Sequence, residues 1–157
     1  DRGYRLVRAN EGGRRLLGLA GPDGVDLAQD PRPNLLTILF DPDLRPLFVN
    51  WDDVAGQVLR RLQRAVLRDP GDEELASLLA ELLATPGIPD NWRSPNLRDP
   101  SDPMVSMVVE MGEVRLRLLV TITVFHAPDN VTLEELQIEN YLPLDEATRR
   151  FFHDAAG

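Results

Sequence analysis

The longest regular pattern in the sequence is an alternation of aliphatic and polar residues in its C-terminal third. Between residues 114 and 124, aliphatic side chains recur at alternate positions: Val114, Leu116, Leu118, Val120, Ile122 and Val124. The positions between them include Arg115, Arg117, Thr121 and Thr123. Because successive side chains of a strand point to opposite faces of a sheet, the pattern predicts a strand with one apolar face. Other elements of the chain must cover that face.

Two further β-rich segments flank this run. Residues 104–111 form the first, and Gly112 with Glu113 fits a tight turn into the long strand. Residues 126–131 then predict a loop. In the third segment, Leu136, Ile138 and Leu142 alternate with Glu135, Gln137, Glu139 and Tyr141. The three segments together predict an antiparallel meander.

A register for the second and third strands follows from matching their polar and apolar positions. Folding about Pro128 places Arg117 opposite Glu139 and Leu118 opposite Ile138. This arrangement pairs polar with polar and apolar with apolar residues on each face. We therefore expect Ile138 to share the apolar face of the long strand.

The residues before position 104 have a helical period instead. One long helix is predicted from apolar residues at intervals of three and four: Val54, Val58, Leu59, Leu62, Ala65 and Val66. Asn50 is expected to cap it. A second helix is expected after Pro70 and Gly71, with a leucine stripe at Leu75, Leu78, Leu79, Leu82 and Leu83. Residues 34–40 predict a short buried helix.

Shorter elements are predicted at both ends of the chain. Residues 3–9 fit a short strand, and Asn10 is expected to cap a helix that runs to about Leu19. Near the other end, Asp145 and Thr148 begin a helix that carries Phe151 and Phe152 on its apolar side. The prolines between residues 86 and 103 predict an irregular surface loop.

These elements fit one domain spanning residues 1–157. A chain of this length can bury roughly two thirds of the surface of its unfolded form in a single core. An opening strand, several helices and an antiparallel meander predict an α+β fold with helices packed on one face of the sheet. This layout is that of a PAS-like sensor domain.

The composition narrows the classes of function. The chain has no cysteine, which excludes disulfides and thiolate metal sites and favours a cytoplasmic location. It shows no secretory signal and no apolar run long enough to span a membrane. A net charge of −9 disfavours contact with a nucleic-acid backbone, so we expect the isolated chain not to bind duplex DNA specifically.

Catalytic and metal-binding motifs are missing from the sequence. His126 and His153, the two histidines, lie far apart and have no second ligand at helical or hairpin spacing. The serines lie in no nucleophile motif, and the glycine pair at residues 12 and 13 lacks the later glycines of a dinucleotide-binding loop. We therefore predict a protein that is not an enzyme and that has no metal site and no cofactor.

The apolar sheet face beneath leucine-rich helices permits two interpretations. It could belong to a solid core, or it could leave a cavity for an apolar small molecule between sheet and helices. Periodicity does not separate these alternatives.

The sequence resembles a known family at several separate motifs. In the first half these are Val7-Arg8-Ala9-Asn10 before a leucine-containing helix, Asn34-Leu35-Leu36 with Phe40 and Pro42, and Trp51 at the head of a long helix. In the last third they are Thr121-Ile122-Thr123-Val124-Phe125, Asp129 with residues 131–136, and residues 143–148. These motifs are similar to the MmyB-like ligand-binding domain of bacterial helix-turn-helix regulators of the XRE type. His126-Ala127 departs from the glycine expected after the Thr-x-Phe strand.

The resemblance implies a C-terminal, PAS-like sensor domain. Family members carry an N-terminal helix-turn-helix domain, which this chain lacks, so DNA would be bound only through that domain. Some members are thought to hold a fatty-acid-like ligand, which here would modulate DNA binding. The alternative is a dimerisation module with a filled core and no ligand, and a homodimer is compatible with both functions.

A ligand cavity is expected between the sheet face and the helices at residues 34–40 and 51–68. The residues predicted to line it are Leu35, Ile38, Leu39, Trp51, Val58, Leu62, Leu118, Val120 and Ile122. Branched aliphatic walls suit a long acyl chain. A carboxylate head group would need an arginine at the rim, since the chain has no lysine, and the sequence does not choose among the arginines.

Overall fold

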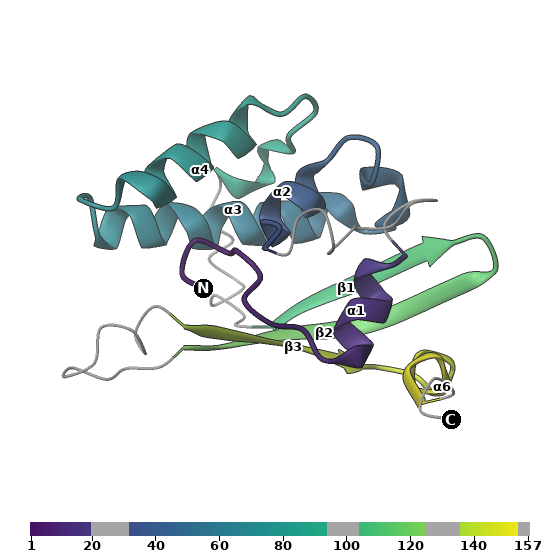
Figure 1. Ribbon diagram of the computed structural model, residues 1–157. Coiled ribbons are helices and arrows are strands. Elements are labelled where there is room, and N and C mark those ends of the chain that lie inside the picture. The colour runs from purple at the N-terminus through teal and green to yellow at the C-terminus, as the bar shows by residue number, and fades with distance from the viewer. Residues whose placement is uncertain (20–31, 94–103, 125–135, 154–157) are drawn as a thin grey trace.

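The computed structural model describes residues 1–19, 32–93, 104–124 and 136–153 (Figure 1). The helices are α1 (Glu11–Leu17), α2 (Leu35–Phe40), α3 (Trp51–Arg68), α4 (Glu73–Ala84) and α6 (Glu146–His153). Two short 3-10 helices are η1 (Arg45–Leu47) and η2 (Asp90–Trp92), the second within the segment predicted as irregular. The strands are β1 (Met104–Met111), β2 (Val114–Val124) and β3 (Gln137–Pro143). The predicted α+β class is confirmed.

The three strands form an antiparallel sheet with β2 in the centre. The strands β1 and β2 pair with Met107 opposite Leu118 and Val109 opposite Leu116, so these four side chains share one face. Gly112 makes the connecting turn at φ 58°, a backbone conformation that glycine adopts without steric cost. The helices α2, α3 and α4 lie over this face in Figure 1. Helices packed on one face of the sheet were predicted, and the structure shows them.

The predicted register between β2 and β3 is wrong. Glu139 pairs with Ile122 rather than with Arg117, and Val120 pairs with Tyr141. The displacement spans an odd number of residues, so it reverses which side chains of β3 face the helices. Glu139 and Tyr141 therefore face the helices, while Ile138 faces outward and is 47% exposed.

The helical layer has its own core, formed where α2, α3 and α4 meet. Its buried residues are Tyr4, Leu36, Phe40, Trp51, Ala55, Leu59, Leu62, Leu75, Leu78 and Leu82. Side-chain caps start two of these helices: Asn34 accepts hydrogen bonds from Leu36 N and Thr37 N, and Asp72 accepts one from Leu75 N. Hydrophobic burial then stabilises helices whose isolated segments would be marginal.

A second core fills the space between α3 and the sheet. Its buried members are Val54, Met107, Val109, Leu116 and Leu118. The helix α3 thus contributes to both cores, because Leu59 and Leu62 face the helical layer while Val54 faces the strands. This double packing holds α3 against the sheet and positions the cavity described below.

Asn50 differs from its predicted role as the cap of α3. Its side chain makes no hydrogen bond to the helix. Instead, Asn50 Nδ2 donates to Ser106 O at 2.8 Å, and Asn50 Oδ1 accepts from Val108 N at 2.9 Å. The amide therefore joins the start of α3 to the edge of β1, because an asparagine can donate and accept at once.

Replacement of Asn50 by alanine is expected to lower the free energy of unfolding by about 1 to 3 kcal/mol, because it removes two hydrogen bonds and leaves the partly buried Val108 N without its protein partner. Urea denaturation measures the change. Asn10, which caps α1 through Gly13 N, is the matched control, and its alanine variant should lose about 1 kcal/mol or less. Equal losses in the two variants would contradict a role of Asn50 in joining α3 to β1.

The strand predicted for residues 3–9 is not formed. Tyr4 has φ 62°, and its amide donates to Asp1 O in a turn. A residue in the left-handed region interrupts an extended backbone. Only Arg5 pairs as a bridge, with Asn34. The segment is nonetheless attached to α2, because Leu35 N donates to Tyr4 O and Asn34 Nδ2 donates to Gly3 O.

The chain end after β3 covers part of the edge of β2. Leu144 N donates to Arg117 O, and Arg117 N donates to Thr148 Oγ1, each at 2.9 Å. Thr148 is fully buried, and its amide donates to Asp145 Oδ1 at the start of α6. Hydrogen bonds from the side chain and the amide of Thr148 lower the pKa of the Asp145 carboxyl group. The predicted terminal helix is thereby confirmed, as is the Asn10 cap of α1.

Candidate ligand-binding site

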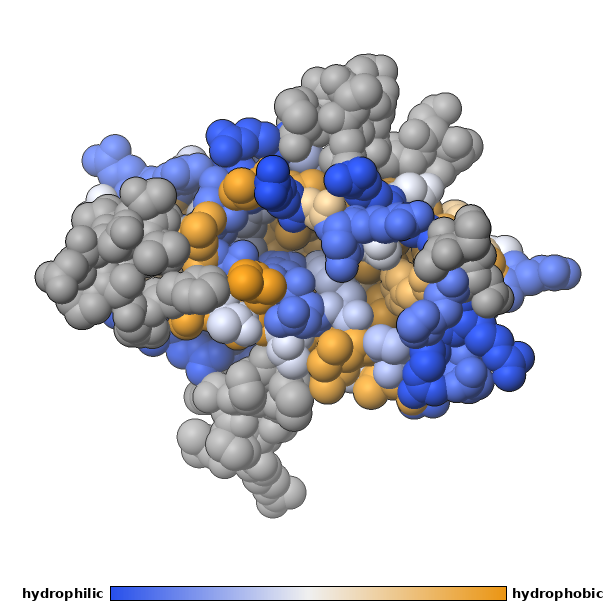
Figure 2. All heavy atoms as spheres, turned by 60° about the horizontal axis from the view of Figure 1, so that its bottom comes forward, coloured by the Kyte–Doolittle hydropathy of each residue, from blue (hydrophilic) through white to orange (hydrophobic). Residues whose placement is uncertain are grey.

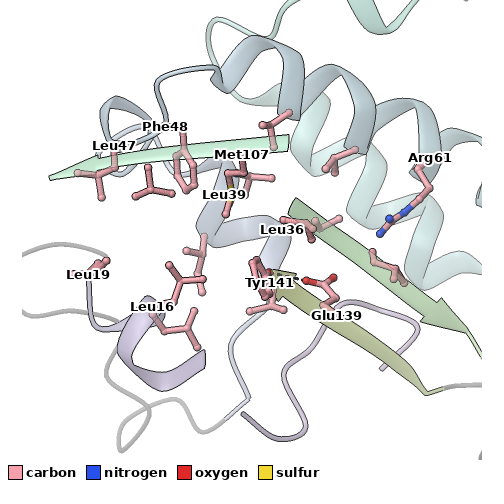
Figure 3. Close-up of a pocket in the computed structure, with 18 residues that line it drawn as sticks. Leu16, Leu19, Leu36, Leu39, Leu47, Phe48, Arg61, Met107, Glu139 and Tyr141 are labelled. Atoms are coloured by element: carbon pink, nitrogen blue, oxygen red, sulfur yellow. Dashed lines mark hydrogen bonds between the residues drawn. The ribbon is translucent and has the colours of Figure 1, made fainter. Parts of the chain in front are cut away.

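An apolar cavity of about 120 Å³ lies between the helical layer and the inner face of the sheet (Figure 3). Four parts of the fold supply its walls: α1, α2 with the segment around η1, α3, and the three strands. Leu16 and Leu19 lie at one end of the view, whereas Arg61 lies at the other. The two cores therefore do not fill all of the space beneath the helices.

Six of the nine predicted residues line this cavity. They are Leu35, Ile38, Leu39, Val58, Val120 and Ile122. The short helix α2 supplies three of them because its buried and half-buried positions turn toward the sheet. On β2, Val120 and Ile122 continue the apolar face beyond the packed part of the sheet core.

The other three predicted residues lie in packed regions. Leu62 and Leu118 are fully buried, in the helical core and the sheet core respectively. Trp51 packs edge-on against Phe40 with ring centres 5.6 Å apart, and its indole Nε1 donates to Leu39 O at 3.0 Å. The guanidinium of Arg45 lies over the Trp51 ring, 3.9 Å from the ring centre. Trp51 is therefore a core residue beside the cavity rather than part of its wall.

Further residues, which were not predicted from the sequence, also line the cavity. They are Leu16, Leu17, Leu19, Leu36, Leu47, Phe48, Val54, Arg61, Met107, Val109, Glu139 and Tyr141. Most are apolar residues whose tertiary positions do not follow from local periodicity. Glu139 and Tyr141 were missed because the predicted register placed them on the outer face of the sheet.

Three polar side chains, those of Arg61, Glu139 and Tyr141, form what we call the polar end of the cavity. Tyr141 OH donates a hydrogen bond of 2.7 Å to Glu139 Oε2. Arg61 Nε and Nη2 each lie 3.3 Å from Tyr4 OH, which accepts from them. Figure 3 shows the guanidinium of Arg61 on the side of the cavity where Glu139 and Tyr141 lie. The structure thus selects one arginine at the cavity wall.

Burial raises the pKa of Tyr141 well above its ordinary value of 10.0, and the charge and hydrogen bond of Glu139 act in the same direction. The positive charge of Arg61 opposes the increase. The phenol therefore stays protonated and can donate to Glu139 throughout the physiological pH range.

Tyr141 is expected to ionise at a higher pH than a free tyrosine when tyrosinate absorbance is followed. Because the folded pKa exceeds the unfolded one, its contribution to stability is complete below pH 10 and is lost as pH rises through the folded pKa. The Tyr141→Phe variant leaves Tyr4 as the only tyrosine, so its absorbance curve should lack the transition at the higher pH. An unchanged titration curve in this variant would contradict the assignment.

The cavity size limits what it can enclose. An engineered apolar cavity of about 150 Å³ in another protein takes up benzene. Typical pockets for whole small molecules hold roughly 300 to 1,000 Å³. The present cavity therefore has room for a short alkyl segment, and a long acyl chain would be only partly enclosed in it.

Other features of the described residues offer no competing site. A cleft of about 580 Å³ at the start of α3 is lined by residues of a single segment between Arg45 and Asp53, and polar and apolar side chains contribute to its surface about equally. The described ranges contain no group of three metal-ligating side chains. Within the same ranges, no helix is both long enough and apolar enough to cross a membrane.

Comparison with known proteins identifies the family. The model of the MmyB-like transcription regulator ligand binding domain matches residues 1–154. Neither the curated proteins nor the solved structures include a match to this chain. The family is defined by ligand binding in regulators, which points away from catalysis. Since the match covers nearly the whole chain, the chain belongs to the family of MmyB-like transcription regulator ligand binding domains.

Proposed function

We propose that this domain senses a fatty-acid-like molecule for a bacterial transcription regulator of the XRE type. The ligand's alkyl chain enters the cavity between α2, α3 and β2, and its head group lies at the polar end. The ligand modulates DNA binding by an N-terminal helix-turn-helix domain in the cytoplasm. The observation that carries this proposal is the unfilled apolar cavity with Arg61 in its wall.

The chemistry of the cavity supports an amphiphilic ligand. Its walls are mostly leucine, isoleucine and valine, which offer no hydrogen bonds to a polar metabolite. Arg61 supplies a cationic donor at one end, and arginine suits the oxygen atoms of a head group. An alkyl chain with one polar terminus satisfies both regions.

Regulation would follow from the attachment of α2 to the N-terminal segment. Leu35, Ile38 and Leu39 of α2 line the cavity, and the same helix begins at Asn34, which is bonded to Gly3. Suppose that α2 can take two positions relative to the sheet. A ligand that binds the protein more tightly in one of them raises the population of that conformation. Residues 1–9 would then transmit the shift to a domain that precedes them in the regulator.

A dimerisation module without a ligand remains the second candidate. The outer face of the sheet supports it, since Ile138 and Leu142 are each 47% exposed there. Figure 2, with the underside of the sheet turned forward, shows apolar side chains at the surface among charged ones. This alternative predicts a dimer that Leu142→Asp dissociates and a melting temperature that alkyl compounds leave unchanged.

Thermal unfolding with octanol or octanoic acid tests the proposal. A ligand at 100 times its dissociation constant adds about 2.7 kcal/mol to the free energy of unfolding, so the melting temperature should rise by several degrees. Delipidated protein is required, because a retained ligand would mask the effect. If neither compound raises the melting temperature at saturation, ligand sensing by this cavity is wrong.

A further inference from the structure

The polar end of the cavity carries one positive and one negative side chain. Arg61 comes from α3 and Glu139 from β3, on opposite walls. Among the residues that the structure describes, no ion pair joins these two groups. An arginine has five N–H donors, and a carboxylate has about four acceptor sites. Each group therefore has hydrogen-bonding capacity left beyond its contact with a tyrosine.

A free carboxylate on the ligand would be poorly accommodated at this end. It would gain Arg61 as a partner but would also meet the carboxylate of Glu139, so two carboxylates would lie beside the one cation that lines the cavity. Enclosure by apolar walls strengthens such repulsion, because charges interact more strongly away from water. An anion also loses hydration on entering the site.

We propose that the head group recognised here is uncharged and both accepts and donates hydrogen bonds, as a primary amide of a fatty acid does. This inference rests on the proposed ligand-sensing function. The amide oxygen accepts from Arg61, and the amide N–H donates to Glu139. A site built from one donor and one acceptor discriminates against a ligand that leaves either group unpaired.

Titration calorimetry of the native protein with octanamide and sodium octanoate tests the inference. The two ligands have alkyl chains of the same length and differ in head-group charge. At neutral pH, octanamide should bind about tenfold more tightly or better, because apposed like charges cost several kcal/mol. Octanoate binding as tightly as octanamide, or more tightly, would overturn the inference while leaving the ligand-sensing proposal intact.

The Glu139→Gln variant locates the cause of the preference. Removing the negative charge should tighten octanoate binding. The ratio of the octanoate dissociation constant to the octanamide dissociation constant should fall about tenfold. Glu110→Gln is the matched control, since Glu110 is exposed on β1, pairs with Arg115 and faces away from the cavity. The ratio of dissociation constants in the Glu110→Gln protein should equal that of the native protein. An unchanged ratio in a folded Glu139→Gln protein would show that Glu139 does not select the head group.

These experiments distinguish failure of ligand sensing from failure of the head-group assignment. If octanol, octanoate and octanamide all fail to bind, the ligand-sensing proposal itself is contradicted. If they bind without the expected order, only the assignment of the head group fails. The comparison of ligands on the native protein does not depend on whether the variant folds.

Discussion

Truncation of Leu118 to alanine is expected to lower the free energy of unfolding by about 2 to 5 kcal/mol. Leu118 is fully buried at the centre of the sheet core, opposite Met107 and beneath α3. Its removal loses buried apolar surface and leaves a void that close-packed neighbours fill only in part. Chemical denaturation measures the change.

Leu142→Ala is the matched control for that loss. Leu142 lies on β3 in the same sheet but faces outward and is 47% exposed, so its truncation should cost under about 1 kcal/mol. Similar losses at Leu118 and Leu142 would contradict the assignment of the inner and outer faces.

Replacement of Val120 by tryptophan is expected to abolish stabilisation by octanol or octanamide. Val120 lines the cavity from β2, and an indole ring would occupy a space of about 120 Å³. The ligand-dependent gain of about 2.7 kcal/mol at saturation should disappear. Overpacking is expected to lower the stability of the unliganded protein by about 1 to 3 kcal/mol.

Thr123→Trp places the same ring on the same strand but on the outer face, at an exposed position. Ligand-dependent stabilisation should persist in this control, because the cavity is unchanged. If the Val120→Trp protein still gains stability from octanol, the ligand binds elsewhere.

Periodicity was sufficient to predict most elements of the fold. The alternation in β2 and the helical spacing in α3 and α4 each extend over many residues, so the buried face of each element could be identified. The prediction of a strand at residues 3–9 was wrong because a single residue, Tyr4, has a left-handed backbone conformation, which tertiary contacts stabilise. No local pattern signals such a residue.

The register of β3 could not be derived in the same way. The aliphatic residues Ile138 and Leu142 lie on the outer face of this strand, whereas Glu139 and Tyr141 lie on the inner face. Matching the apolar residues of β2 with those of β3 therefore placed Ile138 on the inner face of the sheet, where it does not lie. The structure instead turns a tyrosine–glutamate pair inward, where their hydrogen bond and the cavity accommodate them.

The candidate site was likewise predicted only in part. The sequence predicted aliphatic walls from α2, α3 and β2, and six of its nine residues do lie on the cavity. The polar end was not predicted, because Arg61 is one of several arginines on α3 and Glu139 was assigned to the wrong face. Which arginine faces the cavity depends on how α3 is rotated between its two cores.

Nuclear Overhauser effects between bound octanamide and the protein's methyl groups test the central claim most directly. We expect contacts from the alkyl chain to Leu39, Val58 and Val120, which line the cavity from three elements. Contacts restricted to Ile138 and Leu142, on the exposed outer face, would contradict it.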